Sequence, residues 1–114
     1  MSRGWGALLF VALSGCQHSR NACPTNLPSQ CPSPGPSWSA TVSQVVSTSC
    51  EPCHSSTGVA NDRPFESYSQ VYALRGTSLD QVYTCAMPPA DGGVLDETDR
   101  QQLIDWFVCG AQNN

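Results

Sequence analysis

Two cysteines and a histidine stand together at residues 50–54, which read Cys50-Glu-Pro-Cys53-His54. Two thiols at this spacing can form thioether bonds to the two vinyl groups of one porphyrin, and the adjacent imidazole can then coordinate its iron. The spacing rule makes a chance match a roughly 1% event in a chain with this many cysteines and histidines. The pentapeptide therefore predicts a covalently attached c-type haem, with Cys50 and Cys53 as thioether residues and His54 as an axial ligand.

Three other interpretations of the cysteines remain open. A Cys-x-x-Cys pair can be a thioredoxin-like redox couple, but that motif belongs to a βαβ setting and this chain has no alternating strand pattern. A structural zinc site usually adds a second cysteine pair, whereas Cys85 and Cys109 each stand alone. In the third interpretation, all six cysteines beyond the N-terminal segment form disulfides.

A methionine is the candidate for the second axial ligand of the iron. Met87 follows His54 by 33 positions, in the sequence Cys85-Ala-Met87-Pro-Pro. A lone methionine more often fills a core, but two following prolines make the backbone a rigid extended loop, which suits a side chain held towards a metal. At about 3.3 Å per residue, the intervening chain can pass around one porphyrin edge. We therefore expect Met87 to coordinate the iron.

The N-terminus has the features of an export signal. One positive charge, Arg3, precedes the uncharged and mostly apolar run Trp5–Leu13, which is far shorter than the roughly 20 residues of a membrane-spanning helix. The run ends in Leu-Ser-Gly-Cys16, which resembles a bacterial lipobox. We expect residues 1–15 to be a lipoprotein signal peptide and Cys16 to carry lipid. The alternative is an ordinary signal peptide in which Cys16 is incidental.

Composition limits the remaining classes of function. A chain of 114 residues has room for one domain, and seven cysteines are typical of an exported protein. Charged residues make up 12% of the chain and the formal net charge is −4. The five basic residues are scattered along the chain: Arg3, Arg20, Arg63, Arg75 and Arg100. Nucleic-acid binding needs a basic patch, so we expect no nucleic-acid partner.

The mature chain divides into a linker and one domain. Residues 16–37 are rich in proline and serine, which predicts an extended tether between the lipid and the domain at residues 38–114. One helical face is predicted near the start of the domain by Trp38, Val42, Val45, Val46 and Ser49.

Two further helices are predicted, with an ambiguous element at 78–84 between them. The first covers residues 66–75, with Tyr68, Val71 and Tyr72 inward and Gly76 as its stop. The second begins at the N-cap Asp96 and ends at Gly110. Its apolar stripe is formed by Leu103, Ile104, Trp106, Phe107 and Val108. The fold class is therefore mainly α.

The order of these features is similar to that of the class I c-type cytochromes, over residues 38–111. The likeness rests on the Cys50-x-x-Cys53-His54 motif, the Met87-Pro-Pro loop and a final helix ending in W-x-x-x-G-A at residues 106–111. It implies a cytochrome c-like fold in which three to four helices pack around one covalently bound haem. The first and last helices should cross, with Val42 or Val46 against Leu103, Trp106 or Phe107. The chain departs from the family in its short stretch between His54 and Met87, and in having no lysine to ring the haem edge.

With Cys50 and Cys53 assigned to haem and Cys16 to lipid, four cysteines remain, which allow three disulfide pairings. We expect Cys85–Cys109, which would tie the methionine loop to the last helix, and Cys23–Cys31.

The expected function is single-electron transfer rather than catalysis, because two axial ligands leave no open position on the iron. A lipid anchor would hold the protein at a bacterial cell envelope, facing the periplasm or the exterior, where redox proteins would be its donor and acceptor. One alternative is a haem-based peroxidase or ligand sensor in which Met87 dissociates. Another is a cofactor-free, disulfide-stapled surface lipoprotein.

Overall fold

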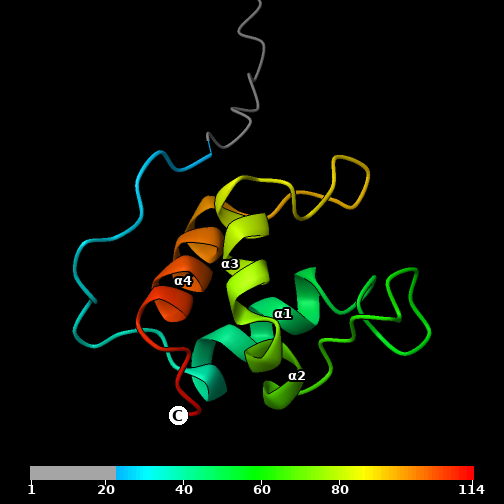
Figure 1. Cartoon of the computed structure of the whole chain (residues 1–114), viewed down its shortest axis with the longest axis horizontal. Coiled ribbons are helices and arrows are strands. Elements are labelled where there is room, and N and C mark those ends of the chain that lie inside the picture. The colour runs from blue at the N-terminus through cyan, green and yellow to red at the C-terminus, as the bar shows by residue number, and fades with distance from the viewer. Residues whose placement is uncertain (1–22) are drawn as a thin grey trace, which may run out of the picture.

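The computed structural model describes residues 23–114, and this part of the chain contains four α-helices and no strand (Figure 1). A π-helical segment η1 (Trp38–Val42) leads directly into α1 (Ser43–Ser49). The chain then forms α2 (Tyr68–Ala73), α3 (Arg75–Tyr83) and α4 (Glu97–Val108). The expected mainly α class is confirmed at this level. The proposed signal peptide and Cys16 lie outside the described residues.

The first predicted helix is present as η1 and α1. The Ser37 hydroxyl caps it by accepting a hydrogen bond from the amide of Ala40, and Val42, Val45 and Val46 are buried. η1 packs against α4, where the Trp38 ring lies 5.6 Å from that of Trp106. The first and last helical segments are therefore in contact, through Trp38 of η1, while the expected crossing through Val42 or Val46 stays a prediction.

The middle of the chain differs from the prediction. Gly76 does not end a helix but lies in the first turn of α3, which includes most of the element that the sequence left ambiguous. The break between α2 and α3 falls at Leu74, whose amide bonds back to the carbonyl of Val71. Val71 is buried as expected, but Tyr72 is exposed rather than inward.

The last helix follows its predicted signals. The Asp96 carboxylate accepts a hydrogen bond of 2.8 Å from the Thr98 amide, and Leu103, Ile104 and Trp106 are buried. Gly110 has a φ of +99°, the left-handed conformation that glycine adopts most readily at a helix end. α4 packs along α3, so these two helices form one wall of the domain (Figure 1).

Two disulfides fasten the segment before η1 to the helices. Cys23 bonds to Cys85, and Cys31 bonds to Cys109. The expected pairing of Cys23 with Cys31 and of Cys85 with Cys109 is therefore wrong, although the same four cysteines are used. The described part of the proposed tether consequently lies along the domain (Figure 1).

The positions of Cys85 and Cys109 relative to α4 explain this pairing. The loop that holds Cys85 lies beside the start of α4, because the carbonyl of Met87 contacts Arg100. Cys109 is the C-cap of the same helix, nine residues further on and about 13 Å along the axis. The segment between Cys23 and Cys31 bends at residues 25–26 and 29–30, and it carries Cys23 to the loop beside the start of α4 and Cys31 to the end of that helix.

The described residues contain no helix with the length and apolar character needed to cross a bilayer.

Candidate functional site

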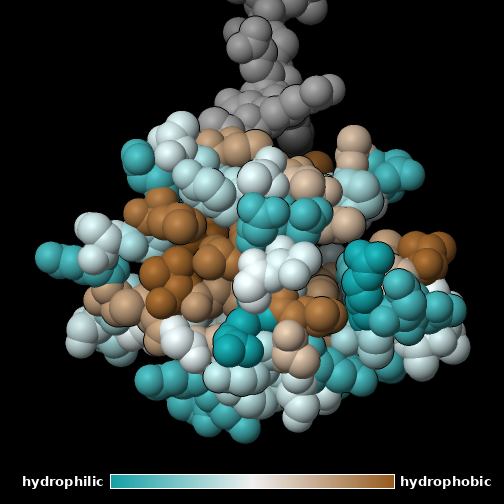
Figure 2. Space-filling view, in the orientation of Figure 1, coloured by the Kyte–Doolittle hydropathy of each residue, from teal (hydrophilic) through white to brown (hydrophobic). Residues whose placement is uncertain are grey.

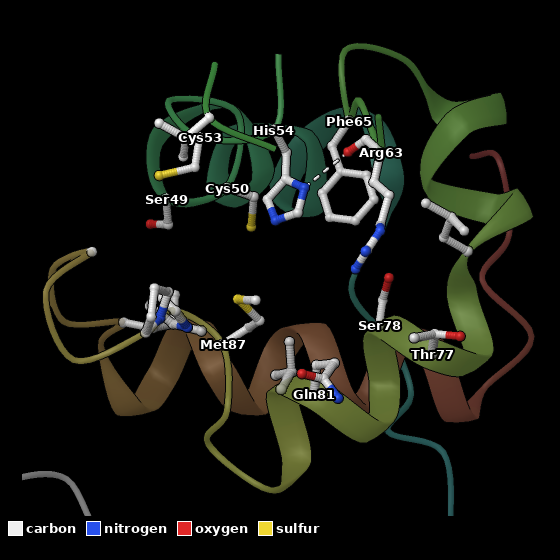
Figure 3. Close-up of a pocket in the computed structure, with 17 residues that line it drawn as sticks. Ser49, Cys50, Cys53, His54, Arg63, Phe65, Thr77, Ser78, Gln81 and Met87 are labelled. Carbon is white, nitrogen blue, oxygen red and sulfur yellow. Dashed lines mark hydrogen bonds between the residues drawn. The ribbon is translucent and has the colours of Figure 1, made fainter. Parts of the chain in front are cut away.

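A cleft lies between the end of α1 and the wall that is formed by α3 and the Met87 loop (Figure 3). The empty volume between its walls is about 910 Å³, which includes the part open to solvent. Its walls are mostly apolar and include Phe65, Leu74, Val82, Pro88 and Leu95. Cys50, Cys53 and His54 line it together with Met87, which is 33 residues further along the chain.

The two cysteines enter the cleft from the end of α1. Cys50 is the C-cap of this helix, and its carbonyl accepts hydrogen bonds from the amides of Cys53 and His54. Both thiols are free, in contrast to the four disulfide cysteines. Burial raises the pKa of the Cys50 thiol to about 11, with a smaller contribution from Cys53. A thioredoxin-like nucleophile needs a lowered pKa, so this environment does not favour a redox couple.

His54 is held in one orientation by its neighbours. Its Nδ1 lies 2.8 Å from the carbonyl oxygen of Arg63, and its ring stacks on Phe65 with the centroids 4.5 Å apart. Because a carbonyl oxygen only accepts, Nδ1 is the donor in this bond, and in the neutral ring Nε2 then keeps its lone pair. Figure 3 shows the imidazole pointing into the cleft. A histidine that donates its second ring N–H to a backbone carbonyl is typical of a metal ligand.

Met87 approaches the cleft from the opposite wall. Its amide donates to the carbonyl of Gln81 at 2.9 Å, and its carbonyl accepts from Arg100 at 3.1 Å. The thioether side chain points across the cleft towards the ring of His54 (Figure 3). The protein thus places the ring nitrogen of His54 and the sulfur of Met87 on facing walls of an apolar space.

Polar groups gather at one end of the cleft. Arg63, Thr77 and Ser78 lie at the end away from Cys53 (Figure 3). The side chain of Arg63 is 62% exposed and pairs with Asp62 at 3.4 Å. The cleft therefore combines apolar walls with a cation and two hydroxyls at one edge, as an amphipathic ligand with acidic groups would require.

The structure of residues 23–114 does not support two of the other interpretations of the cysteines. Only four of the six cysteines in residues 23–114 form disulfides, so a fully disulfide-bonded set is not observed. Within the same range, no group of three or more His, Cys, Asp or Glu side chains could hold a metal ion by itself. The zinc interpretation therefore has no ligand set here.

Several residues that shape the site were not predicted from the sequence. A side chain at Gly58 would overlap the Cys53 carbonyl, so the loop around the motif closes only with glycine there. Phe65 and the Arg63 carbonyl orient His54, and Arg100 holds the Met87 loop. These contacts do not follow the period of a helix or a strand. The local sequence pattern therefore does not predict them.

Comparison of the chain with protein-family models, with curated proteins and with solved structures finds no match in any of the three.

Proposed function

We propose that the protein is a single-electron carrier with one covalently attached c-type haem, and that its fold is cytochrome c-like. The observation that carries this proposal is the facing pair His54 and Met87 across an apolar cleft, with the free thiols of Cys50 and Cys53 in its wall. A haem iron with imidazole and thioether ligands passes single electrons and has no open position for a substrate.

Each residue of the cleft has a defined task in this proposal. Cys50 and Cys53 would bind the porphyrin covalently, and the Nε2 of His54 is the free ring nitrogen available to the iron. Met87 would supply sulfur from the facing wall. The apolar walls exclude water, while Arg63 and the hydroxyl of Ser78 suit the two porphyrin carboxylates. The packing of η1 against α4 agrees with the cytochrome c-like arrangement that the sequence implies.

The proposed location is a bacterial cell envelope, with lipid on Cys16 and the domain facing the periplasm or the exterior. The two disulfides favour an oxidising compartment of this kind. Donor and acceptor would be redox proteins. Val59, which lines the cleft and is 92% exposed, makes one part of its rim apolar. The face shown in Figure 2 mixes apolar and polar areas. The chain has no lysine, so docking through a lysine ring is not part of the proposal.

The test is production of the full chain in cells with a cytochrome maturation system. Mass spectrometry should show one added haem, and the reduced protein should have the visible spectrum of a c-type centre. Met87→Ala should keep the haem but lose the sulfur-to-iron absorption band and lower the reduction potential, because the thioether favours the ferrous state. Val94→Ala, on the exposed loop after Met87, is the matched control and should change neither property.

Other outcomes would identify the alternatives. A colourless protein without added mass would refute the proposal and favour a cofactor-free surface lipoprotein. Binding of carbon monoxide by the reduced wild-type protein at neutral pH would favour a ligand sensor or peroxidase. A Met87→Ala spectrum identical to that of the wild type would refute the assignment of Met87 as a ligand.

A further inference from the structure

Arg100 is the one charged side chain that is buried among residues 23–114, with a relative exposure of 9%. It lies on α4, and its Nη1 donates two hydrogen bonds, of 2.6 Å to the carbonyl of Val82 and of 3.1 Å to the carbonyl of Met87. The ion pair between Asp62 and Arg63 is the one found in the described chain, so no carboxylate there lies within 4.0 Å of the guanidinium of Arg100.

Burial of a cation without an anionic partner costs free energy. A guanidinium cannot escape this cost by losing its proton. Here the cost is offset by the carbonyl of Val82, which lies in the last turn of α3, where the helix dipole is negative. The remaining contact joins the cation to the backbone of a single loop residue, Met87.

Both backbone polar groups of Met87 are therefore fixed to a helix. Its amide is bound to Gln81 on α3, and its carbonyl is bound to Arg100 on α4. The disulfide at Cys85 fastens the loop two residues earlier. Of these three restraints, the contact with Arg100 is the one that adds a positive charge.

We propose that Arg100 is the positioning residue of Met87: it holds the loop so that the thioether stays in the cleft, and its charge favours the reduced centre. This inference rests on the proposed function. A ligand held by a rigid backbone resists replacement by ligands from solution. A buried cation beside the loop opposes the extra positive charge that oxidation creates, because charges interact strongly where water is excluded.

The test compares Arg100→Met with the wild type in the haem-loaded full chain. Removal of the cation should weaken the sulfur-to-iron band and lower the midpoint potential. Imidazole should bind the oxidised variant about tenfold more tightly, because a hydrogen bond from a charged donor no longer holds the loop. A tenfold change corresponds to about 1.4 kcal/mol. Arg75→Met is the matched control, since Arg75 is exposed on α3 and contacts Tyr72 rather than the loop.

Rescue by a conservative variant distinguishes a role of Arg100 in positioning Met87 from a general effect on folding. Arg100→Lys keeps the charge and several donors, so its potential should lie closer to that of the wild type than that of Arg100→Met. If Arg100→Met does not fold, Arg100→Gln replaces it, and the same three properties are measured: the sulfur-to-iron band, the midpoint potential and the imidazole affinity. A coloured wild type together with unchanged imidazole affinity and potential in the variant would overturn this inference alone. A colourless wild type would overturn the proposed function, and the inference with it.

Discussion

Gly58→Ala tests the geometry around the cysteine–histidine motif without replacing any residue that is proposed to bind the haem. A methyl group at this position would lie 2.6 Å from the carbonyl carbon of Cys53 and overlap its oxygen. That carbonyl accepts a hydrogen bond of 2.9 Å from the amide of Ala60, so the loop on both sides of Gly58 is held in place. The Cys53 carbonyl is a backbone group and cannot change rotamer. The backbone at Gly58 and at Cys53 must therefore move apart by about 1 Å to relieve the overlap.

We expect this overlap to lower the free energy of unfolding by about 2 kcal/mol, near the middle of the range for overpacking. In a domain of this size, such a change lowers the melting temperature by about 8–16 °C. The displaced carbonyl belongs to Cys53 and joins it to His54. Its movement should shift both side chains, so the fraction of protein that acquires haem should also fall.

The assay is thermal unfolding followed by circular dichroism, together with the ratio of haem absorbance to protein. Gly76→Ala is the matched control, because a methyl group there meets no atom within 4 Å and lies in a helical turn. Its melting temperature should be unchanged or higher, since alanine is the better helix former. A Gly58→Ala protein that melts with the wild type would refute the close approach of Gly58 to Cys53.

Two further perturbations test the packing around the site. Tyr68→Phe removes the 2.8 Å hydrogen bond from the Tyr68 hydroxyl to the carbonyl of Ala111 and should cost about 1 kcal/mol in chemical denaturation. Tyr72→Phe, at an exposed ring, should leave the free energy of unfolding almost unchanged. Equal losses of stability in the two variants would contradict the hydrogen bond of Tyr68. Replacing Cys23 and Cys85 together by serine removes a cross-link between residues 62 positions apart. The chain-entropy model gives a loss of about 4 kcal/mol, and an unchanged denaturation midpoint would refute that cross-link.

Structural features that depend on residues within one or two helical turns could be predicted from the sequence. The valines of the first helix share a face because of the helical period, and Asp96 and Gly110 mark the two ends of the last helix through local backbone chemistry. Gly76 shows the limit of such signals. A glycine ends a helix only where the backbone turns left-handed, and here that requirement does not arise.

The amino-acid sequence alone determined the mainly α class, the two best-marked helices and the Cys50–His54 motif, because each depends on neighbours a few residues apart. Tertiary structure alone decided which cysteines pair, and it alone brought Met87 opposite His54 and buried Arg100 beneath the loop. These outcomes depend on the path of the chain around α4. That path is set by the packing of the whole domain, which no short stretch of residues specifies.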